Sequence, residues 1–388
     1  MKQTSRPLSI LQVASGFPGW GGTELHLLNL SAQLSLRGHS VTVACRPDGW
    51  VFNKAQEMGL DTLQATVLRQ QDWTDYRKLR DWCRANNTDV VHAHWSTDAF
   101  VPAAAGRAAG VPVRLMTRHS PYPFKTGLGR WIFTEVLYNR LLAVSHSVAR
   151  TLAQCGVPED KLTVIHHGTD VGAFENFSVP ASAIREELGL RGDDIAVGIV
   201  GRVAPEKGHR YLFDALNELD PSTRVKVVVV GDGPEAASSK EYVRERGNAD
   251  RVVFSPFRSD VNNIFNALDI VVVPSTWEEP CSAVIQQAMA LSKPVIGTLV
   301  GGTPEMIVEG ETGLLAPPSD AGALAAAIRA LAGDGAMRKR MGQAGYARVT
   351  SDFSLSVMTD RIEELYRREY ERVRGVGTLQ TALASNAS

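Results

Sequence analysis

The sequence predicts an α/β protein built of two doubly wound, Rossmann-like domains. Short apolar runs rich in valine and isoleucine alternate with segments of helical periodicity, which is typical of parallel sheets with crossover helices. At 388 residues the chain is too long for one ordinary core and has the length expected for two domains. Its apolar content of 44% and charged content of 21% are those of a globular protein.

The first half predicts one parallel sheet with helices between its strands. Residues 24–37 and 76–86 have apolar side chains at helical spacing. Residues 175–182 contain Pro180 and lack periodicity, so we place the interdomain linker there. The strands are predicted at 8–14, 40–44, 90–94, 112–117, 141–144 and 162–165.

The second half predicts a second sheet of the same kind. The boundaries are placed at 1–179 for the N-terminal domain and 180–353 for the C-terminal domain. A last helix is expected over 354–374, and the small, polar tail 375–388 is predicted to be disordered. The strands are predicted at 195–200, 225–230, 251–254, 270–273 and 294–297, with a further helix after Gly322.

Charge and cysteine usage exclude several classes of protein. A net charge of −1 provides no basic surplus to neutralise phosphates, which argues against a nucleic-acid partner. The N-terminal apolar stretch contains Ser9 and Gln12 and is typical of a first strand, not of a secretory signal. We expect a cytoplasmic protein with reduced thiols, because its widely spaced cysteines form no CxxC pair: Cys45, Cys83, Cys155 and Cys281.

The segment from Pro274 to Ala290 carries the strongest functional signal. It follows a predicted strand, passes through an acidic turn that ends in Glu279, and enters a helix over 281–291 with Ser282 near its start. Carboxylates and free backbone N–H groups at one sheet edge suit a ligand with a phosphate end and a hydroxyl-rich end. Gln287 lies eight residues after Glu279, or about 12 Å along a helix.

A second segment, from Val200 to Gly208, predicts a diphosphate clamp. Arg202 and Lys207 lie five residues apart on a glycine-bounded loop that opens a helix. Arginine can bond two phosphate oxygens at once, lysine adds a point charge, and the helix N-terminus adds partial positive charge. The alternative is a surface loop with solvated charges.

These two segments resemble the donor-binding signature of the retaining glycosyltransferases of family 4, which have the two-domain GT-B fold with a cleft between the domains. The family motif GR-x-x-x-EKG matches Arg202 and Lys207, which would hold the diphosphate of a nucleotide sugar without a metal. The family also has two glutamates separated by seven residues. The first matches Glu279, expected to bond sugar hydroxyls, whereas Gln287 stands at the second, ribose-binding position.

The departure at Gln287 predicts weaker nucleotide binding, because an amide offers one acceptor oxygen where a carboxylate accepts from both ribose hydroxyls. Backbone N–H groups at Cys281 and Ser282 would face the diphosphate. By the resemblance, Gly231 and Phe257 border the base pocket. The run 231–236 also imitates a dinucleotide fingerprint, but the next predicted strand ends without an acidic residue, which argues against a nicotinamide oxidoreductase.

The N-terminal half holds further candidates. Gly21 and Gly22 permit close backbone approach to the donor, with Thr23 expected to cap the following helix. His119 follows a predicted strand at the edge where ligands bind, and matches the histidine that the family uses near the transferred sugar. The alternative is that His119 has only a structural role. His92 and His94 hint at a metal pair, but no third ligand is evident, so no metal site is predicted.

The resemblance implies a retaining transferase that moves a hexose-type sugar from a nucleotide-diphosphate sugar to a glycan or lipid-linked acceptor docked on the N-terminal domain. UDP is preferred over GDP as the nucleotide, no cofactor is expected, and the family habit suggests polysaccharide biosynthesis. Residues 124–142 predict either a core helix or one that touches the inner face of the membrane.

Two alternatives remain, a nucleotide-sugar epimerase on the same fold and a nucleotide-sugar binding protein without transfer activity. The second is motivated by Gln287 and by His167, which stands where the family commonly has asparagine.

Overall fold

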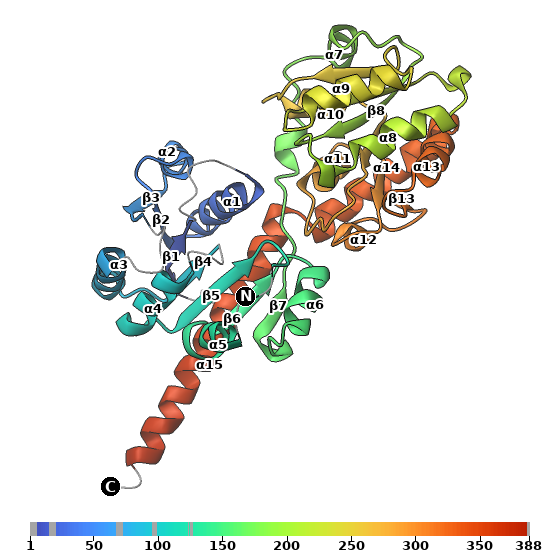
Figure 1. Cartoon of the computed structure of the whole chain (residues 1–388). Helices are drawn as coiled ribbons and strands as arrows, with labels where there is room; N and C mark the ends of the chain where they lie inside the picture. The colour runs from blue at the N-terminus through green and yellow to red at the C-terminus, as the bar shows by residue number, and fades with distance from the viewer. Residues whose placement is uncertain are drawn as a thin grey trace. The chain divides into compact units, whose positions relative to one another are not determined.

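The computed structural model describes residues 6–14, 21–66, 73–94, 99–122, 124 and 127–385, with the side chains of all but 73 and 376–385. The chain forms two compact units, which Figure 1 shows from blue to red along the sequence. The N-terminal unit comprises Met1–Gly168 and Leu355–Ser388, and the C-terminal unit comprises Thr169–Ser354.

The N-terminal unit contains a seven-stranded parallel sheet in the order β3-β2-β1-β4-β5-β6-β7. Six of its strands confirm the predicted ones, and β3 is an edge strand that the sequence analysis missed. Its residues are half-exposed and include only one large apolar side chain, so no apolar run marks it. The strands are β1 Ser9–Val13, β2 Ser40–Cys45, β3 Asp61–Gln64, β4 Val90–Ala93, β5 Val113–Arg118, β6 Arg140–Ala143 and β7 Leu162–Val164.

Helices connect these strands as parallel pairing requires. Helix α1 begins at Gly22 with Gly21 as its N-cap and no capping side chain, so the cap predicted at Thr23 is wrong. A glycine at the N-cap costs only about a few tenths of a kcal/mol relative to a capping side chain. The helices are α1 Gly22–Leu36, α2 Trp50–Glu57, α3 Trp73–Ala85, α4 Phe100–Ala109, α5 Gly127–Trp131, a π-helical turn Ile132–Leu137, α6 His146–Gln154 and a 3-10 turn Glu159–Lys161.

The last helix, α15 Leu355–Ser385, packs on the sheet of the N-terminal unit (Figure 1). Leu365 and Tyr366 belong to the same buried cluster as Ile10 and Leu115. The sequence predicted disorder from residue 375, but the helix continues to Ser385, and 386–388 lie outside the described residues. Alanine, leucine and glutamine in this stretch are good helix formers, which explains why two glycines do not end the helix.

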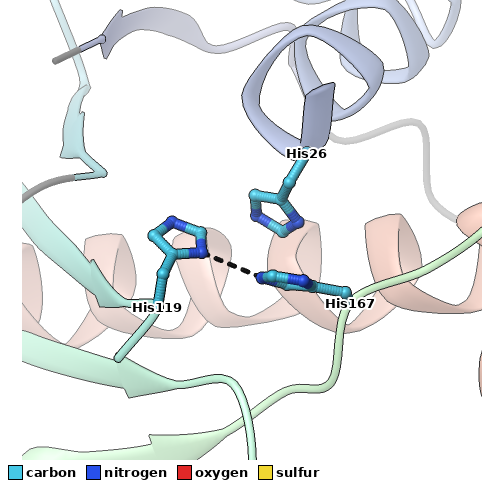
Figure 2. Close-up of side chains that lie close together, drawn as sticks. All are labelled: His26, His119 and His167. Carbon is cyan, nitrogen blue, oxygen red and sulfur yellow. Dashed lines mark hydrogen bonds between the residues drawn. The ribbon is translucent and has the colours of Figure 1, made fainter. Parts of the chain in front are cut away.

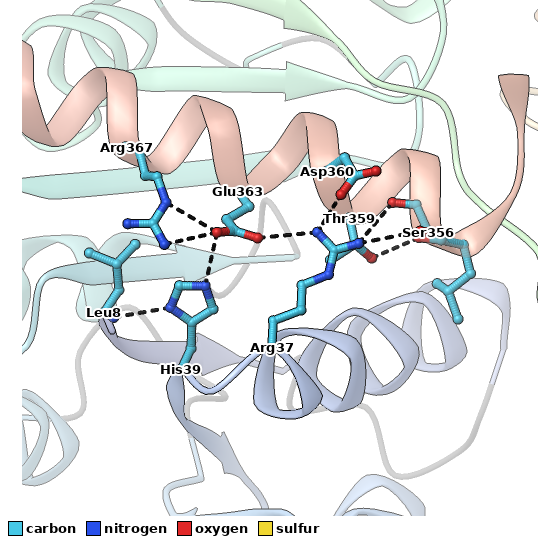
Figure 3. A network of polar contacts seen from close by, with 9 residues as sticks. Leu8, Arg37, His39, Ser356, Thr359, Asp360, Glu363 and Arg367 are labelled. Atoms are coloured by element: carbon cyan, nitrogen blue, oxygen red, sulfur yellow. Dashed lines mark hydrogen bonds and ion pairs between the residues drawn. The ribbon is translucent and has the colours of Figure 1, made fainter. Parts of the chain in front are cut away.

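Polar contacts also hold α15 against α1, with Glu363 at their centre (Figure 3). The Glu363 carboxylate accepts from Arg37 at 3.1 Å and from Arg367 at 2.9 Å, and His39 Nε2 lies 3.3 Å away. The Leu8 N–H donates to His39 Nδ1 at 3.0 Å, which leaves the ring proton on Nε2 for Glu363. Burial alone would raise the pKa of Glu363, but the two arginines lower it.

The C-terminal unit contains a six-stranded parallel sheet in the order β10-β9-β8-β11-β12-β13. Five strands confirm the prediction, and β13 is a sixth that the sequence analysis missed, since Gly313–Ala316 pairs with β12 as a parallel strand. Its two leucines were too short an apolar run to identify it. The strands are β8 Ile195–Val200, β9 Val225–Val230, β10 Val252–Ser255, β11 Ile270–Val273, β12 Val295–Thr298 and β13 Gly313–Ala316.

Both faces of this second sheet are buried, which is why its strands are continuous apolar runs. Along β9, Val228 and Val230 pack in one apolar cluster with Met289, while Val227 and Val229 pack in another with Phe213. The helices are α7 Ala181–Glu187, α8 His209–Ala215, α9 Ala236–Glu245, α10 Val261–Ala267, α11 Ala283–Ala290, α12 Thr303–Met306, α13 Ala321–Gly333 and α14 Gly335–Asp352, with 3-10 turns at Gly172–Phe174, Pro205–Lys207, Leu216–Glu218 and Pro221–Thr223.

The boundary between the units differs from the predicted linker at 175–182. Thr169 forms a backbone bridge with Ser354, and Phe174 packs into the core of the C-terminal unit. These contacts assign 169–179 to the C-terminal unit, although the segment lacks regular periodicity. Among the described residues, no helix is both long and apolar enough to cross a membrane.

The segment 124–142 does not form the single continuous helix that the sequence predicted. It contains α5 and the π-helical turn, and then enters β6 at Arg140. Phe133 is buried with its ring against Phe124 and Tyr138, as a core segment requires, whereas Leu128 and Trp131 are exposed.

Candidate functional site

The strongest candidate site of the C-terminal unit lies where its strand order reverses. Strands β8 and β11 are neighbours, with Ile270 opposite Val197, and each continues into one of the two predicted motifs. The loop of Arg202 and Lys207 follows β8, and the acidic turn of Glu279 follows β11. In open parallel sheets, ligands bind in the crevice at this reversal.

Glycines allow the backbones of these loops to touch. Gly208 has a φ of +71°, and a Cβ there would overlap the carbonyl of Pro274. Gly301 has a φ of +54°, and a Cβ there would collide with the backbone of Glu279. The N–H of Gly302 donates to the Glu279 carbonyl at 2.8 Å, so two neighbouring loops hold the acidic turn in place.

The structure brings Lys207 and Glu279 together. Lys207 Nζ donates to Glu279 Oε2 at 2.6 Å, and Ser275 Oγ donates to the same oxygen at 2.8 Å. The Glu279 side chain is 12% exposed and that of Lys207 33%. The ammonium therefore stands beside a carboxylate that the sequence predicted as a sugar ligand, and Ser275 is a contact that the sequence analysis missed.

Arg202 has a different environment. Its guanidinium pairs with Glu206 on the same loop, and its side chain is 63% exposed. An exposed ion pair contributes little stability, so a doubly charged diphosphate can displace Glu206 at low cost. Arg202 and Lys207 are thus two cations whose present partners are carboxylates of the same site.

The helix α11 begins beside this pair. Ser282 is its N-cap in extended conformation without a side-chain cap, and Cys281 precedes it half-buried. Gln286 is buried with its amide 3.7 Å from Cys281 Sγ, whereas Gln287 is only half-buried. The helix is about one turn shorter than the predicted range 281–291, and Gln287 lies within it.

The two residues predicted beside the base lie on neighbouring loops. Gly231 has a φ of +139°, a Cβ there would overlap the Gly201 carbonyl, and its N–H donates to Ser255 at 3.1 Å. This contact places the loop after β9 next to the one after β10, where Phe257 is 58% exposed. An exposed aromatic ring can stack on a nucleobase.

The loop of Arg202 and Lys207 borders a cavity of about 510 Å³ and the buried His209. The sequence analysis predicted no role for either. The cavity is lined by Pro205, Thr276 and the exposed Trp277, among others. His209 lies beneath the loop, and burial, then Lys207, lowers its pKa to about 4. Trp277 in the acidic turn was the one feature of the sequence that could have indicated this cavity.

The N-terminal unit gathers histidines at the carboxyl end of its sheet, after β4, β5 and β7. His119 lies at the end of β5, as predicted, and its Nδ1 is 2.9 Å from Nε2 of His167. His26 of α1 packs against both rings, with centroid distances of 5.1 and 4.5 Å. His26 was missed because at helical spacing it reads as an ordinary position of an amphipathic helix.

A chain of hydrogen bonds fixes the tautomers of His92 and His94. Gln12 Nε2 donates to the Tyr366 hydroxyl at 3.1 Å, which then donates to His92 Nδ1 at 2.6 Å. His92 Nε2 therefore carries the proton and donates to Thr117 at 2.7 Å. His94 Nε2 likewise donates to Gln12 Oε1 at 2.8 Å. His92 has no lone pair left, so the two do not form a metal pair.

These imidazoles are neutral at physiological pH. Burial lowers the pKa of His92 to about 3 and that of His167 to about 4. Burial, reinforced by neighbouring histidines, also places the pKa values of His26, His94 and His119 well below their ordinary range. His119 can therefore offer a hydrogen bond to a sugar hydroxyl, but it is poorly suited to act as a general acid.

We expect Tyr366→Phe to lower the free energy of unfolding by about 1–3 kcal/mol, because a buried amide donor and His92 Nδ1 would both lose their partner. Urea unfolding followed by circular dichroism measures this change. Tyr370→Phe on the same helix is the matched control, since the Tyr370 hydroxyl accepts from Arg6 in an exposed contact. Equal losses in the two variants would show that the buried chain contributes no special stability.

The predicted glycine loop is described only in part. Gly21 has extended backbone and Gly22 starts α1, whereas 16–20 lie outside the described residues. Thr23, His94 and His119 line a cavity of about 140 Å³, so this end of α1 does border the histidines. Arg118 also lines this cavity, and its guanidinium donates to the Tyr122 carbonyl.

Known proteins match both units. The family model described as "Glycosyl transferases group 1" matches residues 181–348, and "Glycosyltransferase Family 4" matches 20–172. The D-inositol 3-phosphate glycosyltransferase of Mycobacteroides abscessus is 32% identical over 77% of this chain and 70% of its own. The alpha-D-kanosaminyltransferase of Streptomyces kanamyceticus is 26% identical over 71% of this chain and 76% of its own.

Solved structures share the fold. A glycosyltransferase from Rickettsia africae has a TM-score of 0.86 at 21% identity, covering 94% of this chain and 99% of that one. Anabaena HepE in complex with UDP-glucose has a TM-score of 0.79 at 22% identity, covering 92% and 99%.

Proposed function

Because the chain belongs to the group 1 glycosyltransferases of family 4 and has their GT-B fold, we propose that it transfers a hexose from UDP-hexose to a hydroxyl of a glycan or lipid-linked acceptor, with retention of the anomeric configuration. The C-terminal unit binds the donor and the N-terminal unit the acceptor. The contact of Lys207 with Glu279 at the sheet reversal is the observation that carries this proposal.

This contact supports donor binding through charge. Glu279 is held by Lys207 and Ser275 and keeps an oxygen for sugar hydroxyls. Lys207 and Arg202 neutralise the charge that develops on the departing diphosphate, the role that preorganised cations serve in transferase sites. The N–H groups at the start of α11 add donors to the same phosphates.

In the proposed reaction the bond between the anomeric carbon and the β-phosphate oxygen breaks. The acceptor oxygen bonds to that carbon on the same face, and its proton passes to the leaving phosphate oxygen. His119 acts as a neutral hydrogen-bonding partner of the transferred sugar, which agrees with its lowered pKa. The preference for UDP rests on HepE, which binds UDP and UDP-glucose.

We also propose that this reaction takes place in the cytoplasm, in polysaccharide assembly, with a peripheral contact at the membrane. The exposed Leu128 and Trp131 of α5 support such a contact, since apolar side chains with a neighbouring basic residue suit a lipid interface.

A thermal-shift panel with UDP, GDP, ADP and NAD, run on wild type and Arg202→Ala, tests the proposal. We expect stabilisation by UDP that the variant largely loses. No shift with any nucleoside diphosphate, or a shift with NAD alone, would contradict it. Incubation of UDP-glucose with and without acceptor then distinguishes a transferase from an epimerase, which turns over alone, and from a binding protein, which does not turn over.

We expect Gln287→Glu to tighten UDP binding about fivefold. A hydrogen bond to a charged acceptor contributes roughly 1 kcal/mol more than one to a neutral amide. Titration calorimetry with UDP measures this gain. The same titration with 2′,3′-dideoxy-UDP is the control, because the gain should vanish without ribose hydroxyls. An equal gain for both ligands would place Gln287 away from the ribose.

A further inference from the structure

Three histidines from distant parts of the N-terminal unit meet around one point (Figure 2). His26 comes from α1, His119 follows β5 and His167 follows β7. One ring nitrogen from each lies within 4.8 Å of those of the other two. Figure 2 shows the His26 ring directed toward the other two rings, between which the 2.9 Å hydrogen bond runs.

The hydrogen bonding of this group is incomplete. His26 is 7% exposed, and within the described part of the chain neither of its ring nitrogens has a hydrogen-bond partner. The same holds for Nε2 of His119. A buried polar atom left without a partner costs about 1–3 kcal/mol, so a ligand that engages a ring nitrogen of His26 would recover stability. Neutral imidazoles with a lone pair are the protonation state that a metal requires.

We propose that His26, His119 and His167 form a three-histidine site for Zn²⁺. Zinc binds imidazole nitrogens at about 2.0–2.1 Å in tetrahedral geometry, which separates two ligand atoms by about 3.4 Å. The present separations range from 2.9 Å to at most 4.8 Å, so rotation of the rings by small amounts reaches this geometry. The fourth position stays open to water or substrate.

The donor set selects the metal. Three neutral nitrogens without a carboxylate suit zinc, copper, nickel and cobalt, whereas Mg²⁺ and Ca²⁺ require oxygen ligands. In many zinc sites an outer group accepts from the second ring nitrogen of each histidine, and a missing partner weakens binding by about 10- to 100-fold. Because no described group serves His26 in this way, we expect micromolar affinity.

The site also predicts an effect on activity, and this step rests on the proposed function. A metal bound at His119 Nδ1, which now pairs with His167, holds the ring that would face the transferred sugar, so we expect Zn²⁺ to inhibit and not to activate. His167 is the residue that makes the site, because it completes the group with its third imidazole where the family commonly has asparagine.

Cobalt provides the test because its visible absorption reports tetrahedral coordination directly. The full chain, freed of metal by chelator, is titrated with Co²⁺ and then with Zn²⁺. We expect an intense d–d band that saturates at about one equivalent and is displaced by Zn²⁺. His167→Asn should bind Co²⁺ at least about 100-fold more weakly, since loss of a direct ligand costs more than loss of an outer partner.

His166→Asn is the matched control, since the adjacent His166 packs against His146 and lies outside the group. It should keep the band. His26→Gln provides a second variant, and circular dichroism shows that each variant is folded. An unchanged band in His167→Asn, or no tetrahedral band in the wild type, overturns the proposal. UDP binding is measured separately, so failure of the zinc site and failure of the proposed transferase give different results.

Discussion

Lys207→Met will lower kcat/KM for the nucleotide sugar by about 10²- to 10³-fold, the loss typical when one preorganised group that stabilises developing charge is removed. Methionine keeps much of the side-chain volume but loses the ammonium that lies 2.6 Å from Glu279. Both binding and departure of the diphosphate should suffer, so we expect kcat to fall and KM to rise. Steady-state kinetics with UDP-glucose and a glycan or lipid-linked acceptor measure both constants.

Lys339→Met on α14 is the matched control, since it removes the same charge from an exposed position away from the sheet reversal. It should leave kcat/KM within about twofold. A Lys207→Met enzyme with nearly normal kinetics and an intact fold would show that Lys207 only anchors the acidic turn. The diphosphate would then depend on Arg202 and the helix N-terminus alone.

Glu279→Gln will lower kcat/KM by about 10- to 100-fold. The amide preserves the shape of the side chain, but charge-assisted bonds to sugar hydroxyls become neutral ones, at a cost of roughly 1.5–3 kcal/mol. Lys207 would also lose its anion, and for a half-buried ammonium this removes a favourable interaction in the free enzyme. Donor kinetics and UDP titration separate the two effects, because UDP lacks the sugar.

Glu278→Gln is the control, as the adjacent exposed acid on the same turn. Because Lys207 and Glu279 touch, their losses should not add, and the double variant should be less impaired than the product of the single variants. Full additivity would mean that the two residues act on the donor independently. An equal loss in Glu278→Gln would indicate a general effect of charge at the turn.

The prediction of the fold succeeded for strands whose burial produces a continuous apolar run in the sequence. Strands such as β9 and β11 are buried on both faces and consist almost entirely of valine and isoleucine, with Lys226 as the exception. It failed at β3, where an edge position leaves Asp61–Gln64 partly exposed. It also failed at β13, whose two leucines are too short an apolar run to indicate a strand. It also placed the linker too late, because Phe174 joins the second core through a tertiary contact that no local pattern reveals.

The residues of the candidate site also fall into two groups, those that a local motif predicts and those that only the structure brings together. The sequence predicted Arg202 and Lys207 together because their spacing within one loop is a local property, and it predicted Glu279 from the turn that precedes α11. Sequence alone did not pair Lys207 with Glu279, which lie 72 residues apart in the chain, nor did it supply Ser275 or His26.

The sequence by itself determined two parallel α/β units and the charged groups of the donor motif, because periodicity reports burial and short motifs report loop geometry. Only the tertiary structure decided which of these groups meet. The strand order sets β8 beside β11 and brings α1, β5 and β7 to one end of the first sheet. Contacts such as Lys207 with Glu279, and His26 with His119 and His167, follow from that order and not from the neighbours of each residue in the chain.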